Sequence, residues 1–230
     1  MLRLGTPLDI GFRMPASIEP EQAPICDVAS VAEVWDWVKE YYPEQMAIPF
    51  NMQLLEEFVG IEPQLYDFTQ LNNFAICPVV GCTDVFIDRN GEIINITVNI
   101  SNSLDEYHKR WVEAHIFAHF LTGHWNIEFP NGNARQITMF ETTATINPNN
   151  TDPMEEEANN YALELLLPAH TIKNILSSPL PPEISYIAAA VPYEVLAEQA
   201  RRQGIALCGQ KGPDWVPADL QHLMRGRIQI

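Results

Sequence analysis

Two segments decide the fold of this chain: AHIFAH at residues 114–119 and EEEANNYALELLLP at residues 155–168. The first lies within residues 104–121, which we expect to form one α-helix with its N-cap among Ser101 to Ser103. Residues four apart on an α-helix lie on one face, so His115 and His119 can face one metal ion. The first segment therefore predicts a helix that binds metal.

The second segment can supply the third ligand that a catalytic zinc needs beside its water molecule. Asp152 and Pro153 are typical of a helix start, and the helix should continue to residue 167. Its apolar side runs through Ala158 and Ala162, and extending that side back by three residues reaches Glu155. Glu155 should therefore face inward, whereas the neighbouring residues 156 and 157 should be solvated charges.

Asn159 lies four residues after Glu155 on nearly the same helix face. A histidine that binds metal usually donates its other ring N–H to a nearby acceptor. We therefore expect Asn159 to hydrogen-bond the ring nitrogen of one histidine that does not bind the metal.

A β-hairpin should precede the histidine helix. Residues 84–88 and 92–100 are rich in β-branched residues, and Asn90-Gly91 between them is typical of a tight hairpin turn. Alternation places Ile94, Ile96, Val98 and Ile100 on a buried face. Residues 127–146 should form a further strand or an irregular excursion, with β-prone residues at 137–140. Further helices are expected at residues 28–42, 52–58, 170–176 and 193–203.

Together these segments resemble the ImmA/IrrE family of metallopeptidases. Its members carry an arginine and an aromatic residue, then Ala-His-Glu-x-Gly-His and often a further histidine. A helix reading Glu-x-x-Ala-Asn-x-x-Ala-x-x-Leu-Leu-x-Pro follows, which residues 155–168 match in full. The first pattern is matched by Arg110, Trp111, Ala114, His115, His119 and, displaced by one residue, His124.

The resemblance covers roughly Val28 to Gly204 and implies an α+β, zincin-like metallopeptidase domain. A small β-sheet would pack on the helices bearing H-x-x-x-H and E-x-x-A-N, with a helical C-terminal extension. The resemblance implies zinc held by His115, His119 and Glu155, with Asn159 and His124 supporting the ligands. We divide the chain into an extended arm at 1–24, this domain at 25–204 and a tail at 205–230.

One departure from the family pattern concerns catalysis. Ile116 stands where the family has the glutamate that takes a proton from metal-bound water, and an aliphatic side chain cannot do so. Glu113 should point away from the metal, and nothing in the sequence directs Glu128 to it. General acid–base catalysis contributes about 10²–10⁴ in rate, so at most residual hydrolysis is expected.

Three hypotheses of function follow. The resemblance implies cleavage of helix-turn-helix repressors in phages and mobile elements. In the first hypothesis, the chain is a zinc peptidase with impaired hydrolysis that acts on such a partner. In the second, it is a pseudopeptidase that binds a partner as a regulator or structural component. In the third, the histidines are core residues of a lost site. A buried Glu155 without a cation would be costly, which favours metal. Zinc suits the ligands, as do other first-row divalent ions.

Composition narrows the class of partner. The chain has 230 residues, 47% of them hydrophobic, which is enough for a folded core. Its net charge of −17, from 30 acidic and 13 basic side chains, repels nucleic-acid phosphates and excludes direct nucleic-acid binding. The charge suits a basic protein partner, although solubility alone is an alternative reason for it.

We expect a cytoplasmic location. Pro7 and Pro15 interrupt the apolar residues near the start, so no secretory signal is predicted. No apolar run approaches the roughly 20 residues that span a bilayer. The cysteines should be reduced thiols, with pairing or metal binding by Cys77 and Cys82 as the alternative.

Overall fold

The computed structural model describes residues 28–125, 135–176 and 189–205, and these form an α+β fold. The helices are α1 (Val31–Tyr41), α2 (Met52–Val59), α3 (Thr69–Asn72), α4 (Glu106–Leu121), α5 (Pro153–Leu166), α6 (Ala169–Leu176) and α8 (Tyr193–Arg202), with a 3-10 helix η1 at Pro43–Gln45. The strands are β1 (Gln64–Tyr66), β2 (Val79–Ile87), β3 (Ile93–Ser101) and β4 (Arg135–Thr142). None of the described helices is long and apolar enough to cross a membrane.

The strands form one sheet in the order β1-β3-β2-β4. The predicted hairpin is present as β2 and β3, and its turn uses Gly91 at a φ of 85°. The Asp88 carboxylate accepts hydrogen bonds from the backbone N–H groups of Asn90 and Glu92, which stabilises the turn. β4 pairs antiparallel with β2 and β1 pairs parallel with β3. Of the two alternatives for residues 127–146, the strand is confirmed at Arg135–Thr142, and residues 143–146 form a turn.

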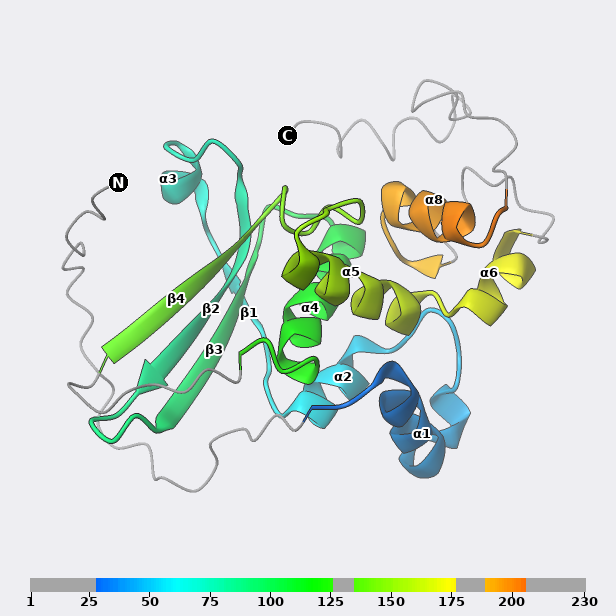
Figure 1. Cartoon of the computed structure of the whole chain (residues 1–230), viewed down its shortest axis with the longest axis horizontal. Helices are drawn as coiled ribbons and strands as arrows, with labels where there is room; N and C mark the ends of the chain where they lie inside the picture. The colour runs from blue at the N-terminus through cyan, green and yellow to red at the C-terminus, as the bar shows by residue number, and fades with distance from the viewer. Residues whose placement is uncertain (1–27, 126–134, 177–188, 206–230) are drawn as a thin grey trace.

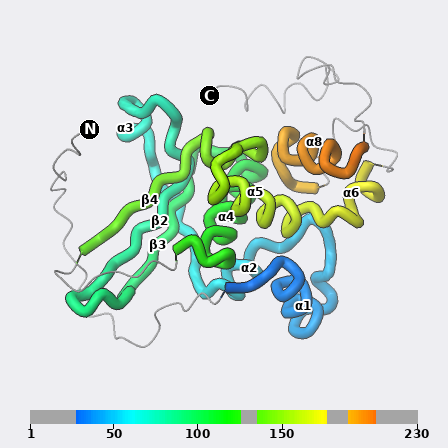
Figure 2. Tube along the Cα trace, viewed as in Figure 1, coloured from blue at the N-terminus to red at the C-terminus, as the bar shows by residue number. Residues whose placement is uncertain are grey.

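The helices of the described residues lie toward one end of the sheet, as Figures 1 and 2 show. α4 packs against β2 and β3 at that end, where Val98 and Ile100 are buried. Ile94, near the other end, is 49% exposed, so the predicted buried face of β3 is correct only beside α4. An alternating pattern specifies which residues share a face but not how far a covering helix extends along it.

The central helix α4 lies between the sheet and the helices α2 and α5. Every residue from Trp111 to Leu121 is buried, as expected for a helix covered on all sides. Its N-cap is Asp105 and not one of the serines at 101–103, so that prediction was wrong. The Asp105 carboxylate accepts from the backbone N–H groups of Tyr107 and His108, and its charge also favours the positive end of the helix.

The other helices follow their sequence signals closely. α5 begins with Asp152 as N-cap and Pro153 in the first turn, and it ends at Leu166, one residue earlier than predicted. Gly60 ends α2 in the left-handed conformation, with φ at 77°. Neither β1 nor α3 was predicted.

Several predictions fall wholly or partly outside the described residues. These are the arm at 1–24, the tail at 205–230 apart from Ile205, and Glu128. The division into domains stays a prediction. Cys77 and Cys82 are both free thiols.

Candidate metal centre

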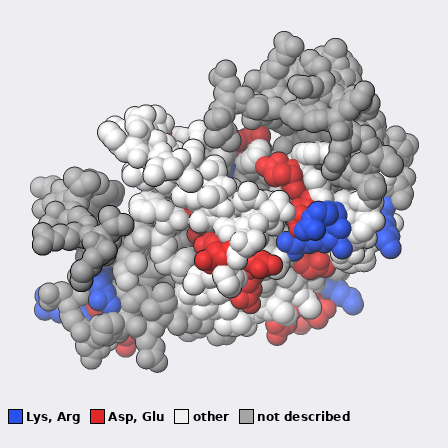
Figure 3. All heavy atoms as spheres, turned by 45° about the horizontal axis from the view of Figure 1, so that its top comes forward, with Lys and Arg blue, Asp and Glu red and all other residues white. Residues whose placement is uncertain are grey.

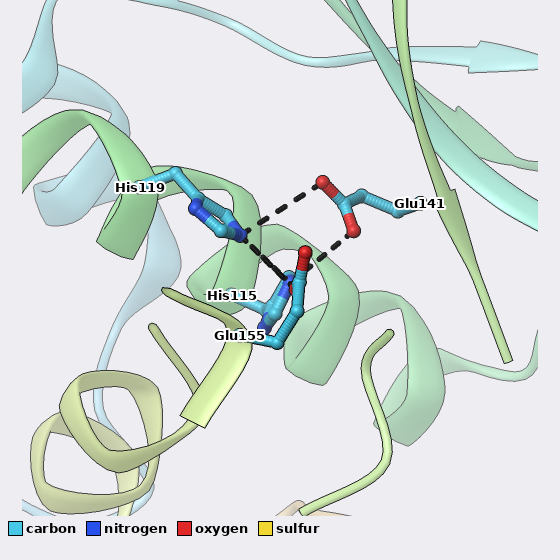
Figure 4. Close-up of side chains that lie close together, drawn as sticks. All are labelled: His115, His119, Glu141 and Glu155. Atoms are coloured by element: carbon cyan, nitrogen blue, oxygen red, sulfur yellow. Dashed lines mark hydrogen bonds and ion pairs between the residues drawn. The ribbon is translucent and has the colours of Figure 1, made fainter. Parts of the chain in front are cut away.

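Four side chains from three elements converge where α4, α5 and β4 meet (Figure 4): His115 and His119 from α4, Glu155 from α5 and Glu141 from β4. One ligand atom from each lies within 4.8 Å of all the others. Both histidines are fully buried, whereas the Glu155 side chain is 19% exposed. The group could hold a metal ion.

Three of these atoms form a compact triangle. The two Nε2 atoms of His115 and His119 are 3.1 Å apart, and Glu155 Oε2 lies 3.2 Å from the first and 3.5 Å from the second. Ligand atoms placed about 2.0–2.2 Å from a tetrahedral zinc are roughly 3.3–3.6 Å from one another. The triangle therefore has nearly the size of one face of a zinc tetrahedron.

Asn159 determines which nitrogen of His115 faces this triangle. The Asn159 Nδ2 group donates to the backbone carbonyls of Thr145 and Asn147, at 3.1 and 3.0 Å. Carbonyls only accept, so the amide orientation is fixed and its Oδ1 accepts from His115 Nδ1 at 3.0 Å. The neutral His115 ring then presents an Nε2 lone pair to the other ligands, as metal binding requires.

His119 is oriented by a second chain of hydrogen bonds. Glu157 Oε2 lies 3.1 Å from His124 Nε2, and a carboxylate requires a donor there. A neutral His124 then has an unprotonated Nδ1, which lies 2.8 Å from His119 Nδ1. His119 donates to it and also presents its Nε2 lone pair to the triangle.

The histidines and carboxylates of the site strongly shift one another's pKa values. Burial lowers the pKa of His115, but the nearby carboxylates of Glu141 and Glu155 outweigh burial and raise that pKa to about 9. The same histidines lower the pKa of Glu155 to about 2, and burial lowers the pKa of His119. His115 therefore holds a proton that a metal ion would displace on binding.

Glu155 Oε2 provides a separate test of the fit. This atom is buried and lies at ion-pair distance from both histidines, yet it makes no hydrogen bond of acceptable geometry. A buried acceptor that points at two ring nitrogens without bonding either is costly unless a cation lies between them. The residues present thus fit a metal ion.

Two residues of this site were not predicted from the sequence. Glu141 lies in the part of the chain for which a strand was only one alternative, although Ile137, Met139 and Glu141 alternate onto one face of β4. Glu157 was expected to be a solvated charge; it is exposed but contacts His124. Glu155 and Asn159 lie on the inward side of α5, where the helical spacing placed them.

Ile116 points to the sheet and is fully buried. A Cβ atom added to Gly81 of β2 would lie 2.9 Å from Ile116 Cδ1 and 3.1 Å from Val112 Cγ1. The missing side chain of Gly81 is thus what allows α4 to approach the sheet at the level of His115.

Other residues of the α4 motif are structural. Arg110 is half-buried and donates to the backbone carbonyls of Ala190 and Phe50. Trp111 Nε1 donates to the carbonyl of Ile146 at 2.7 Å. Glu113 contacts Glu56 of α2 and is not part of the four-residue cluster.

Comparison with known sequences gives one finding. The family model Peptidase_M78, described as the IrrE N-terminal-like domain, matches residues 85–203, which is just over half of the chain. The match contains the whole four-residue cluster, from His115 to Glu155. No curated protein matches the chain.

Proposed function

This chain belongs to the family of IrrE N-terminal-like domains, and from that premise we propose that it is a zinc-binding protein of the peptidase fold that recognises a protein partner, with impaired or absent hydrolysis. The convergence of two histidine Nε2 atoms with an unbonded Glu155 oxygen carries the proposal. His115, His119 and Glu155 would hold the zinc, as the sequence predicts. A bound zinc would supply a Lewis acid and lower the pKa of a coordinated water.

The second part of the proposal concerns the lost base. In H-E-x-x-H peptidases the glutamate belongs immediately after the first histidine, and this chain has Ile116 there. Ile116 is packed against Gly81 and cannot accept a proton. Without general-base catalysis, worth about 10²–10⁴ in rate, hydrolysis should be slow or absent.

The third part concerns the partner. Figure 3 shows acidic side chains in several groups over the middle of the described surface. With a net charge of −17, the chain would attract a basic protein by long-range electrostatics. The DNA-binding domain of a helix-turn-helix repressor is a basic partner of this kind, and we propose a repressor as the target.

An alternative is a pseudopeptidase, which binds its partner without ever cutting it and acts as a regulator or structural component. Complete burial of His115 and His119 favours this alternative, because a substrate carbonyl must reach the metal in a working peptidase. The two readings differ in whether the parent protein cleaves anything.

Elemental analysis of protein purified without a metal-affinity tag tests the proposal. We expect about one zinc per chain in the parent protein and in a His170→Ala control, since His170 is an exposed histidine on α6. His119→Ala should lose the metal. Equal metal content in all three proteins, or none in the parent, would contradict the proposed site.

A cleavage assay separates the two readings of the function. Candidate repressors are incubated with the parent and with His119→Ala, and fragments are measured by mass spectrometry. Binding without fragments supports the pseudopeptidase. Fragments made by the parent but not by the variant establish a residual peptidase.

A further inference from the structure

We propose that Glu141 of β4 is a fourth protein ligand that completes the coordination of the metal. The metal would then be structural and would link the sheet to the helices α4 and α5. The inference rests on the proposed zinc site and adds to it a ligand that the family pattern does not contain. Its basis is the position, burial and contacts of the Glu141 side chain.

The sheet register places Glu141 beside the histidine helix. Glu141 pairs with Gly81 in the antiparallel β2–β4 ladder, so their side-chain positions lie on the same face of the sheet. Ile116 and Val112 approach that face at Gly81. The Glu141 side chain accordingly points from β4 toward the two histidines of α4 (Figure 4).

The Glu141 carboxylate is held in the cluster by direct contacts. Its Oε2 lies 3.3 Å from His115 Nε2, and its Oε1 lies 3.9 Å from His119 Nε2. Thr145 Oγ1 donates to Oε2 at 2.8 Å. The backbone carbonyl of Thr145 accepts from Asn159, so one residue supports both Glu141 and the amide that orients His115.

Burial of this carboxylate favours a positively charged partner. Glu141 is 3% exposed, and among the described residues its ion pairs are with the two histidines and not with Lys or Arg. A buried carboxylate is costly to keep without a positive partner. Two carboxylates and two neutral histidines together balance the charge of one divalent ion.

The number of ligands distinguishes two kinds of zinc site. Catalytic zinc keeps three protein ligands and an open position for water, whereas structural zinc has four protein ligands. Glu141 would occupy the position that water needs. The chain would then lack both the base, at Ile116, and the metal-bound water on which a base acts.

Cobalt substitution tests this inference without an activity assay. The visible absorption of protein-bound Co²⁺ responds to its ligands, so the spectrum is recorded before and after adding azide, a small anion that binds an open position. We expect azide to leave the spectrum of the parent unchanged and to alter that of Glu141→Ala. Glu156→Ala, which removes an exposed carboxylate of α5, is the control and should behave as the parent.

A second variant guards against misfolding of Glu141→Ala. Glu141→Gln retains a side chain that fits the site but has a neutral head group, and we expect it to lower the Co²⁺ affinity by more than about tenfold. An azide-sensitive parent spectrum, or unchanged affinity in Glu141→Gln, would show that Glu141 is not a ligand. A parent that binds no Co²⁺ overturns the proposed zinc site itself, and this inference with it.

Discussion

At the scale of single residues, Asn159 orients one of the histidines of the candidate site. It fixes the tautomer of His115 through one hydrogen bond and is itself fixed by two backbone carbonyls. We expect Asn159→Ala to lower zinc affinity by about 10–100-fold, the usual effect of removing such a partner. The measurement is equilibrium competition with a chromogenic chelator.

Two variants accompany Asn159→Ala. Asn160→Ala alters the next residue of α5, whose side chain contacts Arg202, and should retain the parent affinity. Asn159→Asp keeps an acceptor for His115 Nδ1 and should bind zinc more tightly than Asn159→Ala. Similar affinities in Asn159→Ala and the parent would mean that the tautomer is set in another way.

Gly81 is the second residue with a predictable effect. An alanine Cβ there would meet Ile116 Cδ1 at 2.9 Å, so Gly81→Ala should lower the free energy of unfolding by about 1–3 kcal/mol, as overpacking usually does. Ile116→Val removes the atom involved. In a double-mutant cycle measured by urea denaturation, the second change should recover part of the loss; strictly additive effects would exclude this contact as the cause.

At the scale of elements, α4 and β4 together decide whether the site can be catalytic. Restoring the family glutamate with Ile116→Glu should not create a peptidase, because Glu141 would still occupy the position of the water. We expect metal-dependent cleavage only from Ile116→Glu combined with Glu141→Ala. Single and double variants are compared on one fluorogenic peptide, and activity from Ile116→Glu alone would mean that the position is already open.

The elements also show what the sequence could predict. α4 and α5 were predictable because their residue spacing and, for α5, its cap are local signals, and Glu155 and Asn159 follow from helical geometry alone. The cap of α4 was not, because Ser101, Ser103 and Asp105 are all suitable caps and only Asp105 lies at the right distance from the helix. Which of the three residues becomes the N-cap depends on where β3 ends and α4 begins, and β3 ends at Ser101.

Sheet pairing limited the rest of the prediction. β1 has three exposed residues and therefore no burial pattern, and it exists because Gln64 to Tyr66 pair with the end of β3. Glu141 reaches the site only because the β2–β4 register places it opposite Gly81. Such registers are set by contacts between distant parts of the chain, which a local pattern does not encode.

At the scale of the whole molecule, stability should depend on pH through Glu113. Burial is the largest cause that raises the pKa of Glu113, the nearby Glu56 adds to it and Arg110 opposes it, and together they bring that pKa to about 8. The unfolded value is near 4.5, so the folded chain binds more protons between these pH values. The free energy of unfolding should therefore fall as pH rises through that window and level off above it.

Glu113→Gln removes this pH dependence. The variant should gain stability over the parent by at most a few kcal/mol near pH 8, because a pKa difference of one corresponds to about 1.4 kcal/mol, and by little near pH 5. Urea denaturation at both pH values measures the difference. Glu156→Gln, an exposed control, should follow the parent, and parallel pH profiles for the Glu113→Gln variant and the parent would contradict the raised pKa.

The burial of His115 and His119 has a consequence for the lifetime of a bound ion. A chelator in solution cannot reach these ring nitrogens while α5 and β4 remain in place. An ion held there would leave at the rate of local opening and not at the rate of ligand exchange in water. Metal captured during folding would then stay with the molecule through dilution and dialysis. The rate at which bound zinc exchanges with isotopic zinc would therefore measure the rate at which α5 and β4 open.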